Sequence, residues 1–350
     1  MSSRRAAAVV RLSSLGDVLL AAHLPSFLHE REPGRPVLFV TKERYAGLLE
    51  GHPHVARVHA LRDGEGSLPA LTAALRASNP GEIFDLHRNW RSSRLLAAVP
   101  DATRRLAPKH ALRRRLWVHA RWLRPAPVPP LLRTYRALAG VDPGTPLTPW
   151  LRLAMSDAER TRARDLLPGA ARAQGFVLLG VGARWATKRW PAAHFVRLAE
   201  RLERERGVRS LLAVEPGDEV APEIASFLGA RGETPLTLPF RELAAVGAQA
   251  LAIVSNDSAV LHLGPALGVP AVGVFGGTVP ELGFARQGPR DEAVGIPLGC
   301  RPCSVHGRER CPLGHHACMR DLTPELVFGA VARVLESAPA AIGAASDFVA

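Results

Sequence analysis

The chain has 350 residues, 47% hydrophobic and 22% charged, which is typical of a globular protein long enough for two domains. Its formal net charge of +13 favours an anionic partner, such as a nucleic acid, an acidic membrane surface or a phosphorylated substrate. No apolar run approaches the roughly 18 residues of a membrane-spanning helix, and the N-terminus lacks a signal-peptide cleavage site, so we expect a cytoplasmic protein.

The first motif lies where the apolar run Ala6–Val10 passes into the stretch RLSSLGDVLLAAHLP. The run predicts a β-strand, and the apolar spacing after Gly16 predicts a helix. Asp17 stands at the start of that helix, where the helix dipole stabilises an ionised carboxylate. Such an acid is most often a helix cap. A catalytic role is the alternative that this position leaves open.

Strand-like and helix-like segments alternate through the first half of the chain. The sequence predicts strands over 37–41, 56–61 and 82–87, and helices over 67–78 (with a serine cap), 91–99 and 131–139. Such alternation is typical of a parallel sheet. The stretch VDPGTPLTPW then predicts a linker, so we expect a first domain over 1–150.

The same alternation starts again in the second half. The sequence predicts strands in FVLLGVG, SLLAV, ALAIVSND and PAVGVF, with helices over 156–167, 192–207, 259–268 and 323–337. We therefore expect a second domain over 151–337 and a flexible tail over 338–350. Two Rossmann-like domains of α/β class would face each other across a cleft, with ligands beyond the carboxyl ends of the strands.

Two loops of the second half carry groups that suit an anionic ligand. In GVGARWATKRWP, Arg184 and Lys188 follow a strand and suit a phosphate site, although a solvated surface loop is the alternative. In FGGTVP, Gly277 lets the backbone approach a ligand closely and Thr278 adds a hydroxyl, although a plain turn is the simpler interpretation.

A third loop, SNDSAVLHLGPALGVP, joins a strand to a helix. Asp257 and Ser258 occupy predicted capping positions, and His262 follows Ser258 by one turn. A lone histidine on a helix is more often packed or solvated, but the strand-to-helix context favours a ligand site. Because all three loops follow strands of one half, they are expected to converge at one edge of its sheet.

The order of the motifs GD, KRWP, NDS-x-x-x-H and FG-x-T-x-P resembles glycosyltransferase family 9, over about Arg11 to Val331. These are the heptosyltransferases that transfer heptose from ADP-heptose during lipopolysaccharide core assembly. The resemblance implies a GT-B fold, an N-terminal acceptor domain, a C-terminal nucleotide-sugar domain and no catalytic metal. This chain departs from the family pattern at Ala259, where the family often has Gly.

The resemblance also implies roles for single residues. Asp17 would be the general base of an inverting transfer to a lipopolysaccharide core or related glycan, a contribution of about 10²–10⁴ in rate. Lys188 and Thr278 would hold the diphosphate of the donor. The remaining predicted donor-site residues are Arg184, Asp257, Ser258, His262 and Gly277. A transferase of the same fold with another nucleotide-sugar or acceptor is the alternative.

A basic segment over 104–124 interleaves arginines with Trp117 and Trp122. Three interpretations remain open: a solvated helix face, a surface for single-stranded nucleic acid, and a site for an acidic lipid-linked saccharide at the inner membrane surface. We predict acceptor binding by Arg113, Arg114 and Arg115. A nucleic-acid-binding module is the remote alternative, because it leaves the four family motifs unexplained.

Four cysteines follow the pattern C-x2-C-x7-C-x6-C near the C-terminus. Four thiolates suffice for tetrahedral zinc, and C-x2-C is a frequent metal-ligand spacing. The alternatives are free thiols or a labile disulfide. The candidate structural zinc ligands are Cys300, Cys303, Cys311 and Cys318, with no metal expected in the reaction.

Overall fold

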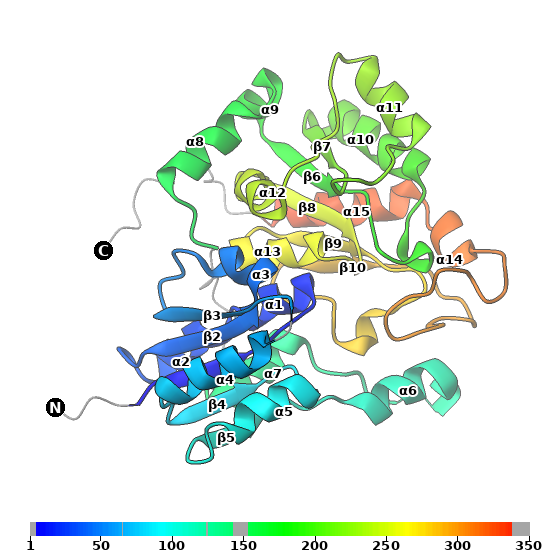
Figure 1. Ribbon diagram of the computed structural model, residues 1–350. Coiled ribbons are helices and arrows are strands. Elements are labelled where there is room, and N and C mark those ends of the chain that lie inside the picture. Colours follow the sequence, from blue (N-terminus) through cyan, green and yellow to red (C-terminus); the bar gives the residue numbers. More distant parts are fainter. Residues whose placement is uncertain (1–4, 65, 124, 143–152, 338–350) are drawn as a thin grey trace.

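The computed structural model describes residues 5–64, 66–123, 125–142 and 153–337. The described chain forms two halves, each built on a parallel sheet of five strands (Figure 1). The predicted domain boundary at 150 and the predicted tail over 338–350 lie outside the described residues. Within the described residues, no helix combines the length and the apolar character needed to cross a membrane.

The N-terminal half has the strand order β3-β2-β1-β4-β5, with Ala7 of β1 paired to Val37 of β2 and to Glu82 of β4. Its strands are β1 (Ala7–Val10), β2 (Val37–Lys42), β3 (Arg57–Leu61), β4 (Glu82–Asp85) and β5 (Thr103–Leu106). Its helices and 3-10 turns are α1 (Leu15–Ala21), α2 (Leu24–Arg31), α3 (Glu43–Ala46), η1 (Gly47–Leu49), α4 (Ser67–Ala77), α5 (Trp90–Ala97), α6 (Ala111–His119), η2 (Arg121–Leu123) and α7 (Leu131–Ala139).

The C-terminal half has the strand order β10-β9-β8-β6-β7. Its strands are β6 (Phe176–Gly180), β7 (Arg209–Ala213), β8 (Ala252–Asn256), β9 (Ala271–Val274) and β10 (Glu292–Val294). Its helices and 3-10 turns are α8 (Asp157–Asp165), α9 (Gly169–Gln174), η3 (Ala186–Lys188), α10 (Ala192–Arg206), α11 (Pro222–Gly229), α12 (Phe240–Gly247), η4 (Val260–His262), α13 (Leu263–Leu267), η5 (Pro280–Leu282), α14 (Ala317–Arg320) and α15 (Pro324–Glu336).

The two halves pack against each other through α1 on one side and η4 and α13 on the other (Figure 1). Leu19 and Leu24 of the first half belong to the same buried apolar cluster as Leu263 and Ala266 of the second. This shared core places the start of α1 next to the turn that follows β8. The predicted motifs of both halves therefore meet at one place.

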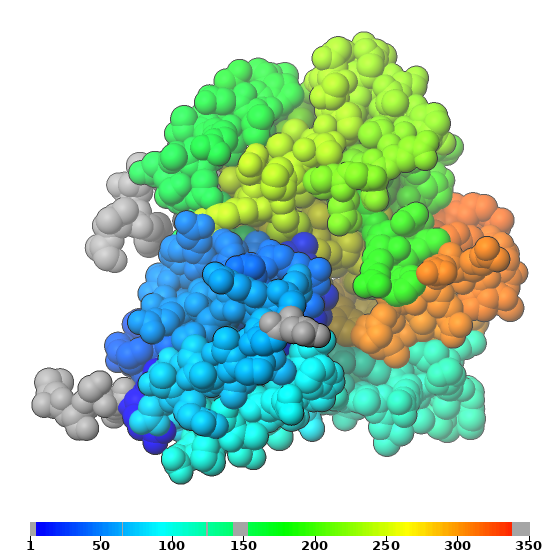
Figure 2. Space-filling view, in the orientation of Figure 1, coloured from blue at the N-terminus to red at the C-terminus, as the bar shows by residue number. Residues whose placement is uncertain are grey.

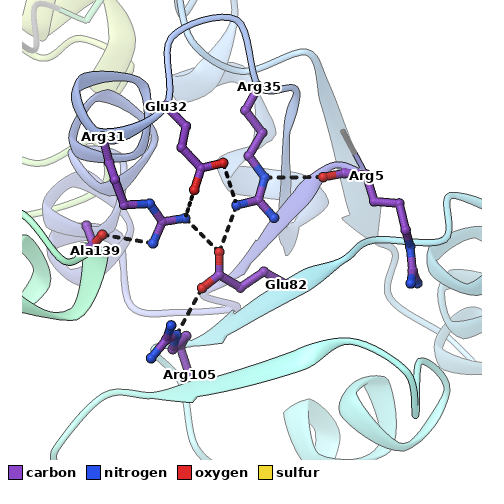
Figure 3. A network of polar contacts seen from close by, with 7 residues as sticks. All are labelled: Arg5, Arg31, Glu32, Arg35, Glu82, Arg105 and Ala139. Atoms are coloured by element: carbon purple, nitrogen blue, oxygen red, sulfur yellow. Dashed lines mark hydrogen bonds and ion pairs between the residues drawn. The ribbon is translucent and has the colours of Figure 1, made fainter. Parts of the chain in front are cut away.

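A charged network at the opposite end of the N-terminal sheet fixes the start of β4 (Figure 3). Glu82 pairs with Arg31 at 2.7 Å, with Arg35 at 2.9 Å and with Arg105 at 2.9 Å. Burial alone would raise the pKa of Glu82, but these guanidinium groups outweigh it and lower the pKa. Arg105, although it belongs to the basic segment, thus has a structural partner.

Two local predictions in the first half differ from the structure. The helix predicted over 67–78 begins at Ser67, but Gly66 is its cap with φ 79°, and the Ser67 hydroxyl donates to Gly64 O at 3.0 Å. The predicted serine cap is therefore wrong. Strand β5 was not predicted, because its four side chains are all exposed and leave no apolar pattern.

Candidate active site

Asp17 is the third residue of α1, just beyond the carboxyl end of β1. Its Oδ2 accepts hydrogen bonds from the Ser14 hydroxyl (2.7 Å) and the Ser14 backbone N–H (3.1 Å), and Arg11 Nη2 lies 2.6 Å away. Burial alone would raise the pKa of Asp17, but the Arg11 charge and the Ser14 hydrogen bonds hold the pKa below its usual range. With 24% of the side chain exposed, Asp17 is an accessible carboxylate that is ionised at neutral pH.

Lys188, Asp257 and Thr278 come from three loops of the C-terminal half and meet at one carboxylate oxygen. Asp257 Oδ2 lies 2.7 Å from Lys188 Nζ and accepts a 2.7 Å hydrogen bond from the Thr278 hydroxyl. The Lys188 and Asp257 side chains are 13% and 6% exposed, and Thr278 is buried. The three loops thus converge, as their positions after neighbouring strands predict.

The capping positions predicted for Asp257 and Ser258 are wrong. Turn η4 begins after Ala259, and no side chain caps it. The Ser258 hydroxyl instead shares a 3.0 Å hydrogen bond with the Ser255 hydroxyl. The start of η4 is therefore half-buried and uncapped, and Ser258 bonds back to the end of β8 instead.

His262 lies where the two halves touch. A Cβ atom at Gly16 would come within 2.7 Å of His262 Cδ2, so only glycine fits before Asp17. Burial lowers the pKa of His262, the carboxylates Asp257 and Asp17 act in the opposite direction, and Lys188 adds to the lowering. His262 is therefore neutral at neutral pH, and its Nδ1 has no hydrogen-bond partner among the described residues.

Gly277 is held against the loop that carries Lys188. Its N–H donates to Thr187 O at 2.9 Å, and a Cβ atom would lie 3.0 Å from both Thr187 Cβ and Cys303 Sγ. The Thr187 hydroxyl in turn accepts from the Arg308 N–H at 2.8 Å. Close backbone approach therefore explains the glycine. In Figure 2 the green segment near residue 190 and the orange segment near residue 310 lie side by side.

Arg301, which no sequence motif points to, supports the same loop through backbone carbonyls. Its Nε donates to Gly276 O at 2.5 Å, and its Nη2 donates to Phe275 O at 2.7 Å and Thr278 O at 3.1 Å. Its Nη1 donates to Ile296 O. Burial lowers the pKa of this guanidinium, with the thiols and Glu281 acting in the opposite direction. One half-buried cation thus holds the backbone on both sides of Gly277.

A model of glycosyltransferase family 9 (heptosyltransferase) matches residues 69–316 of the chain. The chain belongs to this family. Lipooligosaccharide heptosyltransferase 2 of Campylobacter jejuni is 28% identical over 156 residues, 43% of this chain and 48% of that protein. The chain thus spans about half the length of the C. jejuni relatives that it matches. Lipopolysaccharide heptosyltransferase 1 of Pseudomonas aeruginosa is 27% identical over 325 residues, 84% of this chain and 85% of that protein.

Solved structures of family 9 proteins share the fold. Escherichia coli ADP-heptose lipopolysaccharide heptosyltransferase II has a TM-score of 0.68 and 19% identity, over 95% of this chain and 98% of that chain. The family 9 protein of Veillonella parvula has a TM-score of 0.70 and 18% identity, over 97% and 99%. These likenesses confirm the predicted α/β architecture of GT-B type.

Arg184, the last predicted donor-site residue of this family 9 chain, lies outside the Lys188–Asp257–Thr278 network. Arg184 is exposed, and its guanidinium lies 4.9 Å from the centre of the Trp185 ring. A donor-site role for Arg184 stays a prediction.

The three arginines predicted to bind the acceptor lie in different surroundings. Arg115 is exposed, and the half-buried Arg113 donates to Pro127 O at 3.4 Å. Arg114 donates to Leu282 O at 3.0 Å and stacks over the Phe284 ring at 4.6 Å, so its guanidinium joins the two halves. Their roles toward an acceptor stay predictions.

The four cysteines line one cavity of about 270 Å³ beside Thr187 and Gly277. All four are free, and burial raises the pKa of the Cys318 thiol to about 11. Within the part of the chain that the structure describes, no three His, Cys, Asp or Glu side chains are arranged to hold a metal ion. A structural zinc site stays a prediction that these contacts do not support.

Proposed function

We propose that the chain is an inverting glycosyltransferase that moves a heptose from an ADP-activated donor to a lipopolysaccharide core or related acceptor. The observation that carries this proposal is the meeting of two sets of residues at His262. Asp17 comes from the N-terminal half, and the Lys188–Asp257–Thr278 network comes from the C-terminal half. Gly16, next to Asp17, lies against the His262 ring, and His262 belongs to the turn that follows Asp257, so we infer that one bound molecule reaches both sets.

In the proposed reaction, an acceptor hydroxyl attacks the anomeric carbon of the donor while the Asp17 carboxylate takes its proton. The bond from the anomeric carbon to the ADP oxygen breaks, and ADP leaves with one more negative charge. Because Arg11 and Ser14 hold Asp17 in its ionised form, the base is ready at neutral pH. A single displacement inverts the anomeric centre.

In this proposal Lys188 supplies positive charge for the diphosphate, with no catalytic metal, and the Thr278 hydroxyl turns from Asp257 Oδ2 to donate to a diphosphate oxygen when the donor binds. Other backbone N–H groups of these loops complete the anion site in this proposal, since the Gly277 N–H already donates to Thr187 O. An ADP-linked donor is supported by family membership and by the solved E. coli heptosyltransferase WaaC with ADP-2-deoxy-2-fluoro heptose, which has a TM-score of 0.60. We further propose that residues 1–150 bind the acceptor and residues 151–337 bind the donor.

A ligand panel followed by a transfer assay tests the function. ADP should raise the melting temperature more than GDP or UDP, and EDTA should leave turnover unchanged. With ADP-heptose and a heptose-free core acceptor, the product should carry the inverted anomeric configuration by NMR. Stabilisation by UDP alone would contradict the ADP-heptose assignment, and a retained configuration would contradict the single displacement.

A further inference from the structure

Helix α6 and turn η2 form an arm, residues 111–123, that projects away from the N-terminal sheet (Figure 1). The sequence has no acidic residue between Asp101 and Asp142. The arm and its approach carry Lys109, the arginines at 113–115 and Arg121. The arm is therefore strongly basic, with no carboxylate of its own to neutralise it.

One face of the arm combines these cations with exposed apolar side chains. Leu112, Arg115 and His119 recur at helical spacing on α6 and are all exposed, and Trp122 is exposed in η2, beyond the end of the helix at Ala120. Leu112 is 73% exposed, Trp122 is 76% exposed, and the adjacent Leu123 is 54% exposed. Large apolar side chains gathered at such exposure mark a surface that contacts another body.

The opposite face of the arm is fixed to the protein. Val118 is buried, and Trp117 Nε1 donates to Ala126 O at 3.4 Å. Arg114 anchors the arm to the C-terminal half through Leu282 O and the Phe284 ring. Leu112 and Leu123 are thus exposed on an anchored arm, and the exposed Trp122 lines an open pocket between the arm and Pro297 of the C-terminal half.

We propose that this exposed face binds the surface of a bilayer that contains anionic lipid. A short helix with Trp and Leu on a basic surface fits the boundary between headgroups and acyl chains. Nucleic acid fits less well, because Leu112 and Leu123 offer bases neither stacking nor hydrogen bonds. The proposal extends the proposed function, since docking would bring the enzyme to a lipid-linked acceptor, but binding to lipid requires no transferase activity.

Co-sedimentation of the full chain with vesicles tests whether the exposed apolar side chains of the arm contribute to bilayer binding. The protein should bind vesicles of phosphatidylethanolamine and the anionic lipid phosphatidylglycerol. It should not bind vesicles of phosphatidylcholine, which carry no net charge. The triple variant Leu112→Ser, Trp122→Ser, Leu123→Ser should lose roughly tenfold or more in partitioning. The matched control is Leu166→Ser with Leu326→Ser, two exposed leucines of the C-terminal half, and it should bind as the wild type does. Equal melting temperatures establish that each variant is folded.

Charge substitutions test the electrostatic part in the same assay. Lys109→Gln with Arg115→Gln should weaken binding by roughly tenfold, whereas Arg160→Gln with Arg204→Gln, exposed arginines elsewhere, should not. Binding should also fall as salt is raised. Equal binding to phosphatidylcholine, no binding to anionic vesicles, or arm variants that bind normally would each overturn the proposal. Arm-dependent binding to an RNA oligonucleotide without vesicle binding would assign the arm to nucleic acid instead. No donor or acceptor is present, so these outcomes are independent of the proposed transfer.

Discussion

Lys188 and Asp257 form an ion pair, with Nζ 2.7 Å from Oδ2 and both side chains largely buried. The cation proposed to hold the donor diphosphate is therefore already oriented by a carboxylate before the ligand arrives. Thr278 donates to the same oxygen, so one carboxylate orients both of the groups that are proposed to contact the diphosphate. This arrangement gives Asp257 a positioning role that its place in the NDS motif did not specify.

Lys188→Ala should weaken ADP binding by about tenfold or more, because a hydrogen bond to a charged group contributes about 1.5–3 kcal/mol. It should also lower the free energy of unfolding, because Asp257 loses its buried partner. Calorimetry with ADP and urea unfolding measure the two effects. Arg197→Ala is the control, since Arg197 is an exposed cation of α10 outside the predicted donor site. Unchanged ADP affinity in Lys188→Ala would remove Lys188 from the donor site.

Asp17→Asn should abolish transfer and leave ADP affinity within about twofold of the wild type, because Asp17 belongs to the opposite half from the diphosphate ligands. Arg11→Gln should raise the pKa of Asp17, because the Arg11 charge holds it low. The acidic limb of the pH–rate profile should therefore move to higher pH in Arg11→Gln. Near wild-type turnover in Asp17→Asn would exclude Asp17 as the base.

The sequence was sufficient to predict the alternation of strands and helices and the loops that converge. It predicted α7 over 131–139, where the apolar spacing and Gly140 define both ends, and the structure confirms these bounds. It missed β5, whose exposed side chains carry no period, and it placed capping residues where η4 has none. Local patterns therefore predicted many elements with a buried face, but they missed α12, whose residues 243–247 are all buried, and they failed where tertiary contacts decide.

The contacts that site residues make could not be predicted from the sequence either, because tertiary packing determines them. Arg11 precedes Asp17 by six positions, and nothing local indicates that its guanidinium turns back onto that carboxylate. Arg301 lies in the cysteine-rich segment, yet it supports the Gly277 loop through backbone carbonyls, which leave no trace in the sequence. The contact between Gly16 and His262 likewise depends on how the halves pack.

Arg301→Gln should act on donor binding through the loop that it supports, because a neutral amide cannot satisfy the same carbonyls. We expect the KM for the donor to rise by about tenfold with a smaller change in kcat, since Arg301 is a positioning residue. Arg301→Lys should bring the KM for the donor part of the way back to the wild-type value, because it returns the positive charge. Arg310→Gln, an exposed arginine of the same segment, serves as the control. Equal donor KM in Arg301→Gln and Arg310→Gln would contradict this role.

Acid should destabilise the protein through buried histidines. Burial lowers the pKa of His23 and of His52 to about 4, despite backbone contacts that favour the charged form. Both are neutral in the folded protein, and the unfolded chain takes up a proton on each as pH falls below about 6.5. The free energy of unfolding should therefore fall between about pH 6.5 and pH 4, by up to about 1.4 kcal/mol per pH unit for each histidine.

His23→Gln should reduce the slope of stability against pH in that window. The His23 ring contacts Leu19 O at 3.2 Å and, across the two halves, Pro265 O at 3.4 Å, and a neutral ring donates to only one of them. Gln keeps one donor and removes the titration. His119→Gln, at an exposed histidine, serves as the comparison. Urea unfolding across the pH range measures these slopes. The same slope in both variants would exclude His23 as a source of the acid destabilisation.

The four cysteines should behave as free thiols. They line one cavity without a metal-binding arrangement, and burial raises the pKa of Cys303 and Cys318, so these thiols stay protonated at neutral pH. Thiol titration should find few reactive groups in the native protein and all four in denaturant, and EDTA should leave the melting temperature unchanged. About one zinc per chain, with thiols that titrate only after chelation, would instead show that a metal draws the cysteines together. Because Cys303 N–H donates to Gly277 O at 3.0 Å, such a metal would also fix the donor loop, and its removal should then weaken ADP binding.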